Sequence, residues 1–119
     1  VILFVPKAQV SEWELQLMTK SACPHVLALN TAARQHLDQA MLTAVKALDV
    51  LGAQMITSVE FSGRINAPDT GPVQHLIYSF IPRLPYAPDT FSEAQLRWIT
   101  GCYPEDIAEA CRQAIAHHI

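Results

Sequence analysis

The sequence contains little cysteine, and its cysteines are not arranged for disulfides. Cys23, Cys102 and Cys111 form an odd set at irregular spacing. Free thiols in a reducing compartment explain such a set better than a disulfide framework does, so we expect a cytoplasmic protein. Internal repeats and low-complexity tracts are also missing, and the 119 residues have the usual size of one domain with one core.

Long apolar runs and a strong net charge are missing as well. The opening run Val1 to Val5 is stopped by Pro6 and has no basic segment before it, unlike a signal peptide or a membrane span. The net charge is −3, and no basic stripe accompanies the aromatic residues, so we expect neither a membrane nor a nucleic-acid partner. Because the sequence opens on Val1 inside an apolar run, we expect the natural polypeptide to extend further toward its N-terminus.

What the sequence has is a clear hydrophobic pattern, since 50% of its residues are hydrophobic and 16% are charged. Residues 1–6 form an apolar run, and residues 12–19 alternate between Trp13, Leu15 and Leu17 on one face and polar residues, Glu14 and Gln16 among them, on the other. A period of two predicts strands. The short segment between the two runs predicts a hairpin, and residues 20–29 are expected to be a loop.

From Asn30 the period changes to that of a helix. Asn30 or Thr31 can cap its start, and Gly52 follows its last apolar position, so we expect a helix over residues 31–51. Apolar residues at steps of three and four give it one buried stripe. The stripe is made of Leu37, Met41, Ala44, Val45, Leu48 and Leu51.

Two further strands are predicted over residues 54–61 and 73–81, joined by the loop 62–72. The strand 73–81 is apolar on both faces, so we expect it inside the sheet, and Pro82 is expected to end it because proline cannot donate to the ladder. Its alternation separates two sets of side chains. Leu76, Tyr78 and Phe80 form one set, and His75, Ile77, Ser79 and Ile81 form the other.

The C-terminal region predicts two shorter helices. Ser92 and Gln95 form a capping box that starts the first, and Pro104 starts the second. The buried face of the second is expected to contain Ile107, Ala110, Cys111, Ala114 and Ile115. The element order predicts an α+β fold, in which an antiparallel sheet of four or more strands carries a long helix across one face and two shorter C-terminal helices.

The segment 73–83 resembles the strand of the histidine-triad family, which reads His-apolar-His-apolar-His-apolar-apolar-Pro-Arg after a glycine-rich loop. His75 matches the first histidine, and Pro82 with Arg83 matches the ending. The other two histidine positions are Ile77 and Ser79. In the family the middle histidine attacks the α-phosphate and carries a covalent nucleotide. Ile77 has no lone pair with which to do so.

The order of elements is similar to the C-terminal half of galactose-1-phosphate uridylyltransferases. In those two-unit enzymes the N-terminal half holds the nucleophile, and the C-terminal half contributes metal-binding histidines. The matching positions here are again Ile77 and Ser79. The resemblance implies that residues 1–119 are a single histidine-triad-like domain, equivalent to the C-terminal half of a longer chain. It also implies a homodimer or a second domain as partner. The hydrophobic pattern supports the same expectation, because the predicted helices cannot cover both faces of so apolar a sheet.

Four residues are candidates for binding a nucleotide or phosphate, namely Gln74, His75, Ser79 and Arg83. Arg83 can clamp a phosphate or be a surface charge, and His75 can be a ligand or a structural residue. Ser79 needs a base, and the nearest on its face is His75, roughly 13 Å away along the strand. We expect no catalytic residue and no cofactor. We also expect no metal, because the zinc-compatible residues lack paired spacings. Those residues are Cys23, His25, Cys102, Cys111, His117 and His118.

The leading hypothesis is a catalytically degenerate histidine-triad-like module that binds a nucleotide or serves dimerisation and assembly. It rests on Ile77. The alternative is part of a nucleotidyltransferase or phosphorylase acting on a nucleotide or nucleotide sugar. In that case the catalytic histidine lies in a segment outside this sequence.

Overall fold

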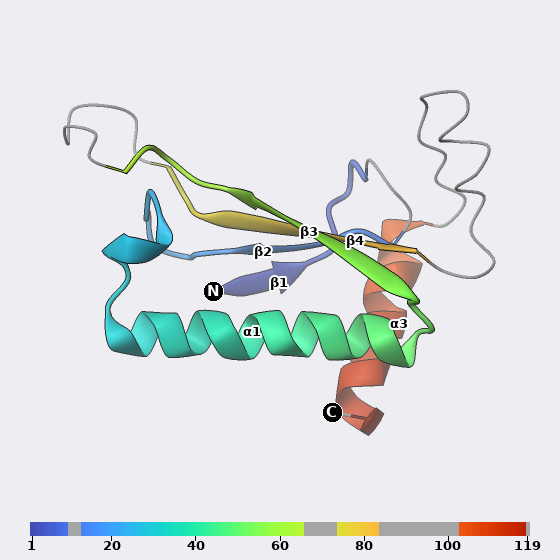
Figure 1. The fold of residues 1–119 in the computed structure, drawn as a ribbon. Helices are drawn as coiled ribbons and strands as arrows, with labels where there is room; N and C mark the ends of the chain where they lie inside the picture. The colour runs from blue at the N-terminus through green and yellow to red at the C-terminus, as the bar shows by residue number, and fades with distance from the viewer. Residues whose placement is uncertain (10–12, 66–73, 84–102, 119) are drawn as a thin grey trace.

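The computed structural model describes residues 1–9, 13–65, 74–83 and 103–118. In this part of the chain four strands form one antiparallel sheet in the order β1-β2-β4-β3, and the helices α1 and α3 lie on the same face of it (Figure 1). The α+β class predicted from the sequence is therefore confirmed. The elements are β1 (Ile2–Phe4), β2 (Leu15–Met18), η1 (Val26–Ala28), α1 (Thr31–Val50), β3 (Met55–Phe61), β4 (Ile77–Arg83) and α3 (Pro104–His118). The helix predicted from Ser92 lies outside the described residues.

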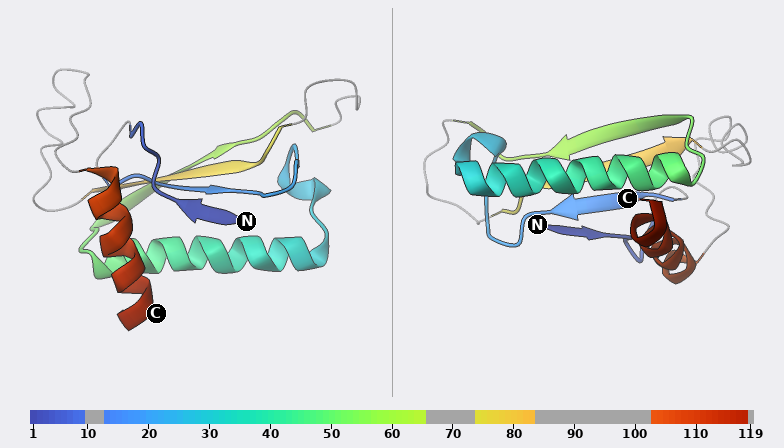
Figure 2. Two further views of the ribbon diagram at one scale, coloured as in Figure 1. Left: turned by 180° about the vertical axis from the view of Figure 1, so that it is seen from behind. Right: turned by 90° about the horizontal axis from the view of Figure 1, so that it is seen from below.

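The sheet places β4 between β2 and β3, as its apolar character on both faces predicts. The strands β1 and β2 form the expected antiparallel pair, with Leu3 opposite Leu17. On the other side of β2, Leu15 lies opposite Phe80 of β4. This register directs the alternating apolar side chains of three strands to one face, where α1 crosses the sheet (Figure 2).

The helix α1 begins where the sequence predicts and ends at Val50, one residue before the predicted end. The side chain of Asn30 accepts a hydrogen bond of 2.8 Å from the amide of Ala33, and Gly52 follows the helix with a φ of 99°. One residue of the predicted stripe is wrong, because Val45 is exposed while Ala47 is fully buried. Val45 follows buried Ala44 by one position, which turns its side chain about 100° away from the sheet. No helix among the described residues is long and apolar enough to cross a membrane.

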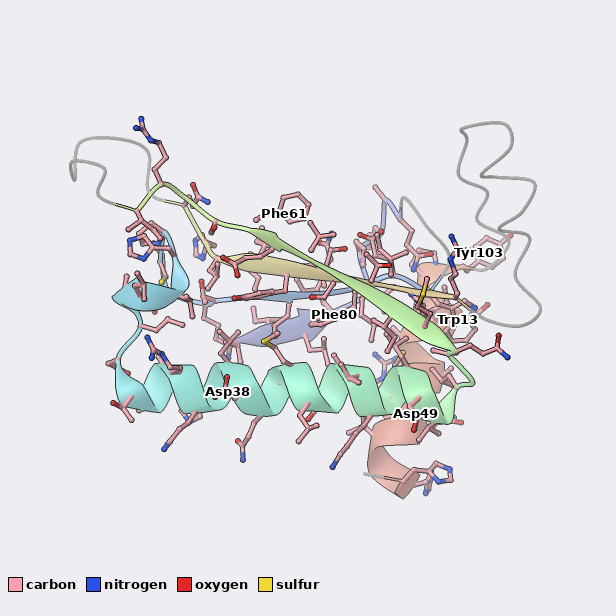
Figure 3. All side chains as sticks on the ribbon, viewed as in Figure 1. Trp13, Asp38, Asp49, Phe61, Phe80 and Tyr103 are labelled. Carbon is pink, nitrogen blue, oxygen red and sulfur yellow. The ribbon has the colours of Figure 1, made fainter. Side chains whose placement is uncertain are left out.

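The core lies between the sheet and the two helices. Phe80 points from β4 toward α1, whereas Phe61 of β3 projects from the opposite face (Figure 3). The helix α3 packs against α1 and closes one end of this layer. The core cluster consists of Leu15, Leu17, Leu37, Ala44, Leu48, Leu76, Tyr78, Phe80, Ile107 and Cys111.

The boundaries of β4 differ from the prediction. The strand begins at Ile77 instead of at residue 73, and it runs through Pro82 to Arg83 instead of ending before the proline. Its pairing with β2 stops at Phe80, so at Pro82 only β3 is a neighbour, with Ile56 opposite. A strand that lacks a ladder on one side tolerates a residue without an N–H, which explains why the proline does not end it.

Candidate functional site

We call the face of the sheet turned away from α1 the open face. Part of the predicted site lies on it. Ile77, Ser79 and Ile81 of β4 belong to it by their alternation with the buried residues Tyr78 and Phe80. The register adds their lateral neighbours. These are Gln16 and Met18 from β2, and Thr57, Val59 and Phe61 from β3.

Ile77, at the position of the family's nucleophile, has hydrocarbon neighbours on both sides. Met18 of β2 and Phe61 of β3 lie directly opposite it in the two ladders. Cross-strand partners of this kind have Cβ atoms about 4.5–5.5 Å apart, so their side chains contact one another. The site of covalent chemistry in the family is therefore part of an apolar strip here.

Ser79, in contrast, belongs to a buried polar cluster. Its hydroxyl donates a hydrogen bond of 2.8 Å to Glu14 Oε1, and the side-chain amide of Gln16 donates to the same oxygen at 3.1 Å. Both Ser79 and Glu14 are almost fully buried. The expectation that His75 is the base nearest to Ser79 is wrong, because the register of β2 against β4 brings the Glu14 carboxylate within hydrogen-bond reach.

The pair of Glu14 and Ser79 is suited to holding the two strands together rather than to catalysis. A serine becomes a nucleophile when a base such as histidine takes its proton, and no imidazole contacts Ser79 among the described side chains. The single O–H of Ser79 is already donated to the carboxylate, so it has no proton to offer a phosphate. A neighbouring carboxylate also repels an anionic group.

His75 is fixed by the backbone of the loop after β2. Its Nδ1 lies 2.7 Å from the carbonyl oxygen of Thr19. A carbonyl can only accept, so Nδ1 carries the proton in this contact, and Nε2 is the acceptor nitrogen of the neutral ring. The hydroxyl of Thr19 accepts from the amide of Leu76 at 3.2 Å, which fixes the same junction from the other side.

Gln74 lies where three segments of the chain come close together. Its carbonyl accepts a hydrogen bond of 2.8 Å from the amide of Cys23, and the amide of Gly63 donates to the carbonyl of Pro24. A Cβ added to Gly63 would be 3.2 Å from Gln74 Oε1 and 3.3 Å from Pro24 Cβ, which is tighter than ordinary packing. Glycine at position 63 therefore allows the end of β3 to meet the segment before β4.

Arg83 lies at the far end of the strand, where its carbonyl accepts from the amide of Gln54 at 2.9 Å. His75 and Arg83 are separated by eight positions, roughly 26 Å in an extended chain. Ser79 and Arg83 lie in β4, whereas Gln74 and His75 lie in the segment before it, so the four predicted ligand residues are spread along the chain instead of surrounding one pocket. A cavity of about 310 Å³ beside the start of α1 is lined by none of the four.

The cysteines and histidines of the described residues do not gather into a metal centre. Cys23 donates from its thiol to the carbonyl of His25 at 3.1 Å, and burial raises the pKa of the Cys111 thiol to about 11. Cys102 lies outside the described residues. Within those that are described, no three side chains of His, Cys, Asp or Glu are close enough together to hold a metal ion.

On the face toward α1, Tyr78 forms a hydrogen bond that sequence reasoning did not find. Its hydroxyl donates to Glu60 Oε2 at 2.9 Å, because Glu60 lies opposite Tyr78 in the β3–β4 ladder. Burial, and then the Glu60 carboxylate, raise the pKa of Tyr78 to about 12. The negative charge of the phenolate would have to form beside this carboxylate in a poorly hydrated place.

The raised pKa of Tyr78 predicts a loss of stability in alkali. An unfolded tyrosine ionises near pH 10, whereas the folded one holds its proton to about 12. The contribution to stability is therefore complete below pH 10 and is lost as the pH rises from 10 to 12. Glu60→Gln should lower the pKa of Tyr78, although not to 10, because burial remains. Phenolate absorbance, with Tyr78→Phe subtracted, measures this, and a wild-type Tyr78 that ionises near pH 10 would contradict it.

Comparison with known proteins supports the fold described above. No protein-family model and no curated protein matches the chain. Among solved structures it is similar to a uridylyltransferase, with a TM-score of 0.81 and 19% identity over 98% of this chain and 39% of that one. It is also similar to an ADP-glucose phosphorylase from Arabidopsis thaliana with bound ADP-glucose, with a TM-score of 0.76 and 17% identity over 93% of this chain and 36% of that one.

A smaller protein gives a third comparison. A HIT-like protein involved in cell-cycle regulation, from Bartonella henselae, aligns with a TM-score of 0.61 and 19% identity over 94% of this chain and 78% of that one. The chain thus spans less than two fifths of the two longer structures but most of the short one. The predicted resemblance to the histidine-triad family is confirmed at the level of the fold. The chain therefore has a histidine-triad-like fold related to that of the uridylyltransferases.

Proposed function

We propose that this chain is a histidine-triad-like module that binds a nucleotide or nucleotide sugar without being nucleotidylated, and that it acts as one part of a larger assembly. The observation that carries the proposal is Ile77, which lies between Met18 and Phe61 where the family has its nucleophile. The similar structures that are named as transferase and phosphorylase support the nucleotide as ligand class. The module is a single domain. It functions in a reducing compartment, where Cys23 and Cys111 remain free thiols.

The open face offers such a ligand two kinds of contact. The apolar strip around Ile77 can lie against a nucleobase, since flat apolar groups stack on hydrocarbon surfaces. At one end of the strip, the Nε2 atom of His75 can accept a hydrogen bond from a sugar hydroxyl. Arg83 is the residue type that binds phosphate with two parallel hydrogen bonds, but it lies roughly 26 Å from His75 in an extended chain, so it does not contact the same nucleotide. Ser79 has no role in this scheme because its hydroxyl is bound to Glu14.

A second candidate function is one wall of an active nucleotidyltransferase or phosphorylase. The observation that favours it is the share of 36% and 39% that the chain covers in the phosphorylase and the uridylyltransferase. The catalytic histidine would then come from chain outside this sequence. Nucleotide binding is common to both candidates, so it is measured first.

Titration calorimetry with ADP-glucose and UDP-glucose tests the proposal. We expect wild-type protein to bind at least one of them and His75→Ala to bind about three- to tenfold more weakly, the effect of one hydrogen bond. His118→Ala, which removes an exposed histidine from the end of α3, serves as the matched control and should bind like wild type. A protein that binds neither ligand would overturn the nucleotide-binding function. Binding that is unchanged in His75→Ala would remove His75 from the site.

A further inference from the structure

The cavity of about 310 Å³ beside the start of α1 has no part in the function proposed above. Its walls are the loop 19–24 after β2, the end of η1, and Asn30 with the first turns of α1, which lie together at one end of the molecule (Figure 1). Sites for small molecules have volumes of roughly 300–1,000 Å³. The cavity is therefore large enough to hold a small ligand.

The charge of the cavity lining is of one sign. Lys20 and His36 line the cavity, and none of its described lining residues is aspartate or glutamate, although the whole chain has a net charge of −3. Within the described part of the chain, neither Lys20 nor His36 forms a side-chain hydrogen bond or an ion pair. The ammonium group of Lys20 is therefore not neutralised by a carboxylate, and the imidazole of His36 can donate from a ring nitrogen whether it is charged or neutral.

Neutral donors of the same lining fit the same kind of ligand. The side-chain oxygen of Asn30 accepts from the amide of Ala33, so the two N–H groups of the Asn30 amide remain for another partner. The hydroxyl of Ser21 also forms no hydrogen bond with a described residue. The first turn of α1 contains no acid, so the positive end of the helix dipole adds to the field of Lys20.

We propose that this cavity binds a small anion of the phosphate class, either free phosphate or the phosphate group of a small ester. A phosphate group presents acceptor oxygens on every side, and the cavity presents the donors of Lys20, His36 and Asn30 around one space. A lysine binds phosphate as a point charge, and the neutral donors fix the oxygens. None of these three residues takes part in the nucleotide contacts proposed for the open face, so the inference goes beyond the proposed function.

Titration with inorganic phosphate, followed by two-dimensional amide NMR, tests the proposal. Ionic strength is held constant, because salt screens contacts between exposed charges. We expect saturable shifts confined to residues 19–24 and 30–36, with a Kd of about 1 mM, since Lys20 and His36 are exposed to solvent. Ribose 5-phosphate identifies the occupant, because tighter binding than that of phosphate indicates an ester and equal binding indicates the free ion. Ribose alone should not bind.

Two substitutions test the residues of the cavity. Lys20→Gln should weaken phosphate binding about fivefold or more, because a charge-assisted hydrogen bond is lost. Lys46→Gln is the matched control, since it removes the same charge from an exposed lysine of α1 that does not line this cavity, and it should bind like wild type. Ala33→Glu places a carboxylate at the cavity and should weaken binding about tenfold or more. Glutamate is favourable at this third helical position, so the variant should fold.

Three outcomes would each overturn the proposal. They are the absence of saturable shifts up to about 20 mM phosphate, equal weakening in Lys20→Gln and Lys46→Gln, and binding to Ala33→Glu as tight as to wild type. Circular dichroism of every variant verifies folding. The calorimetric titration with UDP-glucose is read separately: wild type that binds phosphate in this cavity but no nucleotide would contradict the proposed function alone.

Discussion

Replacing Phe80 with alanine is expected to lower the free energy of unfolding by about 3–5 kcal/mol, the usual loss for a fully buried phenylalanine. The side chain is 1% exposed and comes from the central strand of the sheet. It lies between the sheet and α1, with Leu15 of β2 opposite it in the ladder. Its removal leaves a cavity that the rigid sheet cannot close. Urea unfolding followed by circular dichroism measures the loss.

The control for this substitution is the same residue type on the adjacent strand. Phe61 is 54% exposed and projects from the open face, so Phe61→Ala should change the stability of the monomer by under about 1 kcal/mol. Both variants are measured at the same protein concentration as wild type. Equal losses for the two variants would contradict the assignment of the core to the α1 side.

The parts of the fold that were predicted correctly depend on local signals. The helix α1 is determined by its Asn30 cap, its apolar period and Gly52, all within one stretch of sequence. The central position of β4 follows from apolar residues on both of its faces. The prediction that Pro82 ends the strand was wrong, because the effect of a proline depends on which strands lie beside it. The neighbours of a strand are not a local property of the sequence.

The candidate site was less accessible from sequence because its contacts depend on register. The hydrogen bond between Glu14 and Ser79 joins the residue just before β2 to β4, and the two residues are 65 positions apart. Alternation assigned Glu14 to the correct face, but it could not show that Ser79 would be its neighbour. Tyr78 and Glu60 are a second such pair. Once the register of a sheet is known, polar residues that face each other across strands identify such pairs.

The four predicted ligand residues lie in one short stretch of chain, but they do not share a pocket. Period-two alternation predicts His75 and Ser79 on one face, but β4 begins at Ile77, so His75 lies before the strand. The same extended geometry separates them by roughly 3.3 Å for each residue, so a strand alone cannot bring them together. A compact site needs residues from other elements, and in the described part of the chain those elements supply Met18, Phe61 and Glu14 instead of further imidazoles.

The chain is expected to form no covalent nucleotide intermediate. In the family's reaction a histidine nitrogen attacks the α-phosphorus, forming a P–N bond while the bond to the leaving oxygen breaks. Ile77 has no lone pair, and the hydroxyl of Ser79 donates to Glu14. Removal of an essential nucleophile leaves only binding and electrostatic assistance, so turnover should fall by roughly three or more orders of magnitude relative to an intact site. Incubation with labelled UDP-glucose and a nucleoside phosphoramidate, followed by intact-mass measurement, should show neither an adduct nor hydrolysis.

Comparison of wild type with His75→Ala decides what any residual activity means. His75 is the one histidine of the motif that this chain retains, and its Nε2 atom has the lone pair that the chemistry requires. Turnover that persists in His75→Ala would place the chemistry outside the segment 74–83. Turnover or an adduct that disappears in His75→Ala, but not in His118→Ala, would overturn the inactive-module proposal and make His75 a catalytic residue. The expected result is that all three proteins show only background hydrolysis, while wild type and His118→Ala bind the nucleotide equally well.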